Sequence, residues 1–205
     1  MKVYDEVEPI GQKAPIIISS PHSGTAFPQE LKPLYKPELI DNPSDTDWFI
    51  HQLYDFAPEL GIKVISANYS RWIIDLNRSP QNTPLYSYDR IITALCPTSD
   101  FTGESIYNAD YELTAKEIEN RLVKYYRPYY QKIQDEIGQL KATFGYAIFW
   151  DAHSIKQFVP TIRKDIFPPL ILGDNEGKTA HSDLSKTVLN ELERKGYEIA
   201  YNDPF

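Results

Sequence analysis

The 205-residue sequence has a single cysteine, Cys96, and no long hydrophobic run. One cysteine cannot form an internal disulfide, which favours a reducing compartment. No apolar stretch approaches the roughly 20 residues that a membrane-spanning helix needs. The polar and acidic residues 1–13 also lack the hydrophobic stretch of a signal peptide. We therefore expect a cytoplasmic protein that does not enter a membrane.

Basic residues are in the minority, with 21 Lys and Arg against 29 Asp and Glu, for a net charge of −8. Such a charge repels phosphate backbones, and no basic stripe offsets it, so a nucleic-acid partner is excluded. The hydrophobic content of 41% and charged content of 24% are those of a globular protein. We find no internal repeat and expect one domain over residues 1–205.

Short apolar runs alternate along the chain with segments of helical periodicity. The expected strands are residues 14–20, 62–67, 145–150, 169–172 and 197–201, with a further short extended piece at 71–75. The expected helices are residues 45–56, 114–141 and 178–195; Thr114 and Glu117 form a capping box, and Pro128 should kink or split the second helix. Residues 21–40 and 79–113 are expected to be loops. The alternation predicts an α/β fold with a mostly parallel sheet, whose ligands bind at the carboxyl ends of the strands.

Two histidines follow two of these predicted strands directly. His22 lies in the segment SSPHSG (19–24), and His153 lies in WDAHS (150–154). Asp151 and His153 are two residues apart, so their side chains leave an extended chain on the same face. Each cluster alone is explained equally well by a polar loop whose groups bond to neighbours. Together they place two of only four histidines at the end of one sheet.

A catalytic zinc ion requires a third protein ligand and an open position for water. Asp45 and Asp47, at the start of a predicted helix, are the obvious source. Acids at that position also cap helices and suit the helix dipole. We favour Asp45 as the cap and Asp47 as the ligand, and the reverse assignment stays open.

A third cluster, YSRWIIDLNR (69–78), contains two arginines and an asparagine. Arg71 and Arg78 beside buried-looking residues suit bidentate pairing with a carboxylate. That carboxylate is either a ligand's or the chain's own Asp75, and for Arg71 the two readings are evenly matched.

Other residues with chemical potential are weaker candidates. His51 and His181 are more simply explained as surface or packing residues. The segment LGDNEG (172–177) reads as a turn and lacks the lysine of a phosphate loop. No Gly-x-Ser-x-Gly motif supports serine chemistry, and Cys96 reads as a packing residue.

The chain resembles the N-formylglutamate amidohydrolase family. The resemblance is carried by SSPHSGTAFP (19–28), SDTDWFIHQLYDFA (44–57), ANYSRWIIDLNRSPQ (67–81), FWDAHSIKQFVP (149–160) and LGDNEG (172–177). These segments span nearly the whole chain in one order, which makes the match specific. The family is similar in fold to zinc carboxypeptidases and aspartoacylase, which implies a three-layer α/β sandwich around a mixed, mostly parallel sheet.

The resemblance also implies roles for individual residues. His22, Asp47 and His153 would hold zinc or another divalent metal, while Arg71, Asn77 and Arg78 would bind the carboxylate of a small dicarboxylate substrate. Family members continue beyond Tyr201-Asn202-Asp203-Pro204-Phe205 into a segment whose glutamate resembles the general base. The base is therefore expected beyond Phe205 or, failing that, at Asp75 or Asp151.

Three functions follow as alternatives. The favoured one is metal-dependent hydrolysis of N-formyl-L-glutamate, a step of histidine degradation. The second is hydrolysis of another N-acyl amino acid, or a carboxypeptidase-like reaction at the same site. The third is a catalytically silent domain that binds a carboxylate ligand or only zinc.

Overall fold

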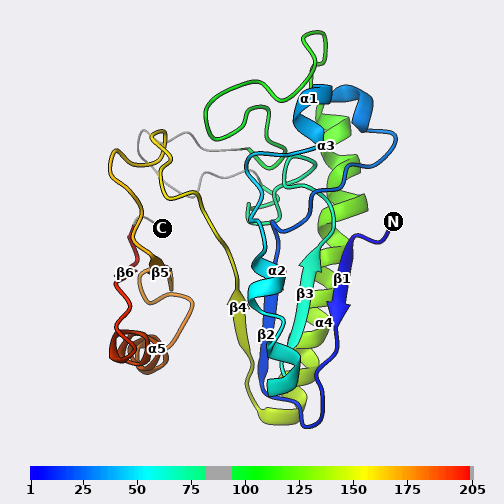
Figure 1. The fold of residues 1–205 in the computed structure, drawn as a ribbon. Helices are drawn as coiled ribbons and strands as arrows, with labels where there is room; N and C mark the ends of the chain where they lie inside the picture. Colours follow the sequence, from blue (N-terminus) through cyan, green and yellow to red (C-terminus); the bar gives the residue numbers. More distant parts are fainter. Residues whose placement is uncertain (82–93, 204–205) are drawn as a thin grey trace. The chain divides into compact units, whose positions relative to one another are not determined.

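Short β-branched runs form the two central strands of a four-stranded sheet. In the computed structural model, β2 (Ile16–Ser20) pairs in parallel with β3 (Lys63–Ala67) and with β4 (Ile148–Asp151). The strand β1 (Tyr4–Val7) pairs antiparallel with β3, which gives the order β1-β3-β2-β4 (Figure 1). The sheet is thus mixed and mostly parallel, as predicted.

The structure describes residues 1–81 and 94–203, and the chain divides into two compact units, Met1–Ile155 and Lys156–Phe205. The four-stranded sheet belongs to the first unit. The assignment of residues 1–205 to one domain stays a prediction. The expected loop at 79–113 falls partly outside the described residues.

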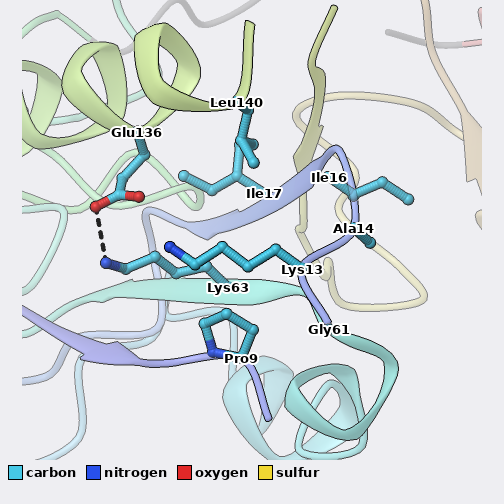
Figure 2. Close-up of a pocket in the computed structure, with 9 residues that line it drawn as sticks. All are labelled: Pro9, Lys13, Ala14, Ile16, Ile17, Gly61, Lys63, Glu136 and Leu140. Carbon is cyan, nitrogen blue, oxygen red and sulfur yellow. Dashed lines mark hydrogen bonds and ion pairs between the residues drawn. The ribbon is translucent and has the colours of Figure 1, made fainter. Parts of the chain in front are cut away.

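The edge strand β1 was not predicted, because its sequence YDEV is acidic and mostly exposed. Its Glu6 forms an ion pair with Lys63 of β3, at 2.8 Å. Lys63 also binds Glu136, at 2.7 Å, beneath the apolar side chains of Ile17 and Leu140 (Figure 2). The strand β1 therefore joins β3 with the help of an ion pair, and it lacks the alternating apolar residues by which a strand is predicted from sequence.

One continuous helical rod covers one face of the sheet (Figure 1). It consists of α3 (Ala115–Arg121), the π-helical turn η3 (Leu122–Tyr126) and α4 (Arg127–Phe144). The predicted cap is confirmed, since the Glu117 amide donates to Thr114 Oγ1 at 3.2 Å. The interruption predicted near Pro128 takes the form of the π-turn, which lies directly before α4 and does not break the rod. Ile17 and Ile65 of the sheet share a buried cluster with Ile133 of α4.

The opposite face of the sheet packs against short elements. Ile18 and Val64 lie in a second buried cluster with Ile50 of α2 (Ile50–Leu53) and Ala57 of the 3₁₀ turn η2 (Ala57–Leu60). The expected loop at 21–40 contains two further short turns of helix, η1 (Lys32–Leu34) and α1 (Pro37–Ile40).

The prediction of a helix over residues 45–56 is confirmed only over α2. The expected start at Asp45 is wrong, because residues 45–49 form turns and irregular structure. Phe49 adopts φ 64°, a left-handed conformation that a right-handed helix cannot contain. Asp45 is therefore not a helix cap. Its place at a turn leaves its carboxylate available for side chains elsewhere in the chain.

The prediction of an extended piece at residues 71–75 is also wrong. The Ile73 amide donates to the Ser70 carbonyl at 2.9 Å, which is the bond of a tight turn. Trp72 and Ile73 are fully buried in the main cluster, so their apolar character reflects packing rather than strand pairing.

The second unit contains β5 (Leu170–Leu172), α5 (Ser182–Arg194) and β6 (Ile199–Tyr201), with β5 and β6 paired in parallel. The predicted strands and helix of this region are confirmed to within a few residues. Of the described helices in either unit, none is long and apolar enough to cross a membrane.

Candidate metal centre

Two histidine-bearing loops leave neighbouring parallel strands at the same edge of the sheet. Strands β2 and β4 are in register with Ser19 opposite Asp151, so the residues that follow them emerge side by side. The rings of His22 and His153 lie 4.9 Å apart between centroids. The predicted convergence of these two histidines is confirmed, and it follows from the parallel pairing.

Asp47 lies between the two imidazole rings. Its amide donates to the His22 carbonyl at 3.0 Å, which fixes the turn against the loop after β2. Its Oδ2 atom is 3.0 Å from His153 Nδ1 and 3.8 Å from His22 Nδ1. The Ser154 amide also donates to Oδ2, at 3.1 Å.

One ligand atom from each of His22, Asp47 and His153 lies within 4.8 Å of the other two. Two imidazoles and one carboxylate are a donor set that binds zinc with a position left for water. His22 and Asp47 are buried and His153 is exposed, so the group is open to solvent on one side. The arrangement fits a divalent metal, and metal binding itself stays a prediction.

Asp45, the alternative ligand, lies outside this group. It accepts hydrogen bonds from Trp72 Nε1 at 2.9 Å and from the Phe101 amide at 3.1 Å. Burial raises the pKa of Asp45, and the bond from Trp72 opposes that rise. Of the two acids, Asp47 is the one whose carboxylate faces both histidines. The contact of Asp45 with Trp72 spans 27 residues and had no local signal in the sequence.

Each histidine uses its other ring nitrogen to bind a second carboxylate. His22 Nε2 is 2.8 Å from Asp75 Oδ1, and His153 Nε2 is 3.1 Å from Asp151 Oδ2. Carboxylates in this position fix the orientation of a metal-binding imidazole and increase its basicity. The Nδ1 atoms of both rings are therefore the ones directed toward Asp47.

Asp75 is fully buried, and its carboxylate accepts several hydrogen bonds at once. It binds Arg71 Nη2 in a short ion pair, and it accepts from the Asn77 amide at 2.9 Å. Burial acts to raise the pKa of Asp75, but the charges of Arg71 and His22 hold it well below its usual value. Asp75 is thus a permanent anion behind His22 rather than a carboxylate that takes up protons near neutrality.

The pKa values of the two histidines move in opposite directions. Burial, with the charge of Arg71, lowers the pKa of His22. Partial desolvation acts to lower the pKa of His153, whose side chain is 31% exposed, but its bonds to Asp151 and Asp47 raise it to about 9. Without a metal, a proton on His153 balances the charge of the two carboxylates. A bound cation would take over that task.

The predicted carboxylate-binding residues surround this centre at different depths. Asn77 is exposed, with Nδ2 3.4 Å from His153 Nε2. The Arg78 side chain is 18% exposed, with Nε 3.8 Å from Asp75 Oδ2. Arg71 is buried against Asp75, and its guanidinium lies 4.7 Å from the centroid of the Phe101 ring. Asn77 and Arg78 are thus accessible to a ligand, whereas Arg71 is bound to the chain's own acid.

The weaker candidates lie elsewhere or have local roles. His181 caps α5 by accepting from the Asp183 amide. Burial raises the pKa of Cys96 to about 11, so this thiol is a packing residue. In the LGDNEG segment, Asp174 accepts hydrogen bonds from Ser185, Tyr201 and Asn202, which makes it a structural hub of the second unit.

Comparison with known proteins gives a consistent result. A family model described as N-formylglutamate amidohydrolase matches residues 14–205. A protein of Pseudomonas aeruginosa named N-formylglutamate deformylase is 39% identical over 176 residues, which cover 84% of this chain and 64% of that protein. A protein of Pseudomonas putida with the same name is 35% identical over 94% of this chain and 72% of that protein. The chain therefore spans about two thirds of the length of these relatives.

Solved structures support the fold. The crystal structure of N-formylglutamate amidohydrolase from Ralstonia eutropha JMP134 superposes with a TM-score of 0.83 at 26% identity, over all of this chain and 78% of that one. A gene product of Agrobacterium tumefaciens superposes with a TM-score of 0.73 at 15% identity, over all of this chain and 75% of that one.

Proposed function

The chain belongs to the N-formylglutamate amidohydrolase family, and from this premise we propose that it hydrolyses N-formyl-L-glutamate to formate and L-glutamate with the help of a divalent metal. The observation that carries the proposal is the meeting of His22, Asp47 and His153 within 4.8 Å. It lies in a chain 39% identical to a protein named N-formylglutamate deformylase.

We assign the metal to zinc, which His22, Asp47 and His153 would hold. A zinc ion bound there would polarise a carbonyl oxygen and lower the pKa of a water to about 7. The chain's own part is to hold the two imidazoles at a fixed angle. Asp75 and Asp151 do so through the Nε2 atoms, at 2.8 Å and 3.1 Å.

Asp151 is the described carboxylate best placed to serve as the general base. Its side chain is 31% exposed, in contrast to the buried Asp75, and it contacts His153 Nε2 at 3.1 Å. Asp75 is buried and saturated with donors, which removes it from that role and makes it a positioning residue for His22. A base must accept a proton from water and pass it to the leaving amine, which requires access to both.

The substrate is a dianion, while the chain carries a net charge of −8. Local cations must offset this repulsion, and Arg78 is the one at the accessible edge of the centre. Arg78 and Asn77 bind a carboxylate of the substrate, and charge-assisted pairing of this kind gives orientation as well as affinity. Arg71 contributes from behind by fixing Asp75.

Some finer assignments stay proposals alongside the reaction. They are the three-layer sandwich, the likeness to zinc exopeptidases and a cytoplasmic location. None of them is needed for the chemistry at the centre.

A panel of N-acyl amino acids tests the proposal. Purified protein loaded with zinc is expected to release formate from N-formyl-L-glutamate, with far lower efficiency on N-formylglycine, which lacks the side-chain carboxylate. Preferential hydrolysis of N-acetyl-L-glutamate would assign a different acyl specificity. Full zinc occupancy with no hydrolysis of any member of the panel would identify a silent binding domain instead.

A further inference from the structure

The segment from Trp72 to Arg78 has no regular secondary structure, yet it carries Asp75, Asn77 and Arg78. Four of its backbone carbonyls accept hydrogen bonds from side chains far away in the sequence. The donors are Tyr35 to the Trp72 carbonyl at 2.9 Å, Arg121 to Ile73 at 3.1 Å, Tyr130 to Leu76 at 2.5 Å and Tyr126 to Arg78 at 2.9 Å.

Three of these donors, Arg121, Tyr126 and Tyr130, come from the helical rod, and we call them the helix donors. Arg121 is 1% exposed and Tyr126 is 8% exposed, so their bonds are shielded from water. The rings of Tyr126 and Tyr130 stack, with 4.6 Å between centroids. Tyr126 and Tyr130 thus pack against each other, and all three helix donors bond to the segment that carries the candidate substrate-binding residues.

The spacing of the helix donors does not suit an ordinary α-helix. Residues four apart share a face, but residues five apart, such as Arg121 and Tyr126, diverge by about 140° at 3.6 residues per turn. The π-turn η3 occupies residues Leu122–Tyr126 and closes with a bond from the Arg127 amide to the Leu122 carbonyl, five residues back. A π-turn accommodates one extra residue, which returns Arg121 and Tyr126 to the same side.

Pro128 is consistent with the position of this turn. Proline has no amide hydrogen, so it cannot donate to the carbonyl four residues earlier, that of Lys124. The ladder of α-helical bonds is interrupted at this point, and the wider turn lies directly before α4. Single π-turns inside α-helices are frequent at functional sites.

We propose that η3 is a positioning device, and that the helix donors hold the 72–78 segment in the register that presents Asp75 to His22 and Asn77 and Arg78 to the ligand. The catalytic part of this inference rests on the proposed function. The helix donors bind the carbonyls of Ile73, Leu76 and Arg78. Asp75, Asn77 and Arg78 lie within the stretch that these carbonyls delimit. Within this stretch, the Asp75 amide donates to the Leu95 carbonyl at 2.7 Å, and the Asn77 amide donates to Asp75 Oδ1 at 2.9 Å.

The test compares a double variant, Tyr126→Phe with Tyr130→Phe, with the control Tyr125→Phe. The Tyr125 hydroxyl donates to the Glu30 carboxylate at 3.3 Å, away from the segment, although Tyr125 lies in the same π-turn. Phenylalanine keeps the packed rings and removes only the hydroxyl donors. The control therefore measures the cost of changing a buried tyrosine in this turn without touching the segment.

Two readouts apply, and the first does not depend on activity. Hydrogen exchange in the metal-free protein reports the amides of Asp75, Asn77 and Arg78, all of which are hydrogen-bonded in the structure. We expect their protection to fall about tenfold in the double variant and to stay unchanged in Tyr125→Phe, as the loss of two hydrogen bonds predicts. Equal protection in all three proteins would overturn the inference.

The second readout is the split between KM and kcat for N-formyl-L-glutamate. We expect the double variant to raise KM by about tenfold with kcat changed less than about threefold, because a misplaced Arg78 weakens binding in ground and transition states alike. Faster exchange with an unchanged KM would also overturn the inference, because the donors would then be structural only. A wild-type protein that releases no formate would contradict the proposed function, while the exchange result still decides whether the donors hold the segment.

Discussion

The imidazole of His22 donates a hydrogen bond from Nε2 to Asp75 Oδ1, at 2.8 Å. The two residues are 53 positions apart in the sequence. This bond leaves Nδ1 directed toward Asp47, so the orientation of one candidate metal ligand is set by a fully buried anion. Arg71 balances the charge of that anion. The candidate metal centre therefore includes Asp75 and Arg71, which lie behind its three candidate ligands.

Replacement of Asp75 by asparagine is expected to weaken zinc binding by about 10- to 100-fold, the usual effect of removing a carboxylate that orients a metal ligand. It also leaves Arg71 as a buried charge without its counter-ion, which should cost about 3 kcal/mol in the free energy of unfolding. Chelator competition and urea unfolding measure the two effects. The matched control is Asp55→Asn, since Asp55 is exposed, and it should change neither. Unchanged zinc affinity in Asp75→Asn would show that the bond to His22 has no part in metal binding.

Truncation of Arg78 to alanine is expected to reduce kcat/KM for N-formyl-L-glutamate by the equivalent of about 2–5 kcal/mol, the range for one partner of a buried charged pair. Arg78→Lys should recover only part of the loss, because lysine cannot form a two-point contact with a carboxylate. Arg127→Ala serves as control, since Arg127 is exposed and pairs with Glu119 on the surface of the rod. Steady-state kinetics with zinc content measured in parallel decides the matter. An Arg78→Ala protein as efficient as wild type would remove Arg78 from the substrate site.

Acid should destabilise the fold through the ion pairs around Lys63. Bonds from Lys132 and Lys63 lower the pKa of Glu6 to about 2, from an ordinary value of 4.5. A carboxylate whose pKa is lower in the folded state than in the unfolded chain stabilises the protein at every pH above its unfolded-state pKa. This contribution to stability is lost as the pH falls from 4.5 toward 2. Urea unfolding between pH 6 and pH 3 should show a smaller decline for Glu6→Gln than for wild type. Glu59→Gln, on the exposed surface of η2, should follow the wild-type curve, and identical curves for all three proteins would refute the role of Glu6.

A methyl group at Gly24 is expected to disturb the loop that carries His22. A Cβ there would lie 2.5 Å from the backbone of Asn68 and Tyr69, which cannot move aside cheaply. We expect Gly24→Ala to cost about 1–3 kcal/mol of stability, as overpacking does elsewhere, and to weaken zinc binding. Gly138→Ala is the opposite case, because its Cβ meets nothing within 4 Å and it lies inside α4. It should stabilise the protein by about 0.5–1 kcal/mol, and thermal unfolding of both variants checks the contrast. Equal stability of the two variants would show that the loop has room to adjust.

Local sequence patterns were sufficient for the strands that position the two histidines. The apolar runs before His22 and His153 predicted β2 and β4, and parallel pairing brought the histidines together. The cap at Thr114 was also predictable, from the Thr-x-x-Glu pattern at the start of the helix. These features depend on a few neighbouring residues, which is why they could be inferred.

Features that depend on distant contacts were not predictable. The helix expected over residues 45–56 begins only at Ile50, after Phe49, whose left-handed backbone has no signal in the sequence. The strand expected at 71–75 is a buried turn, because the apolar side chains of Trp72 and Ile73 pack inward rather than alternate. The pairing of Arg71 with Asp75 was one of two readings of the sequence, whereas the bond of Asp75 to His22 required the fold to be known.

The most direct test of the metal centre is the zinc content per chain after removal of excess metal, for wild type, Asp47→Asn and Asp45→Asn. Asp47 faces both histidines, whereas Asp45 binds Trp72 and the Phe101 amide, so the two acids form a matched pair. We predict one zinc ion per chain in the wild type and in Asp45→Asn, and a loss of zinc in Asp47→Asn. Retention of zinc by Asp47→Asn at the wild-type level would contradict the assignment of the centre to His22, Asp47 and His153.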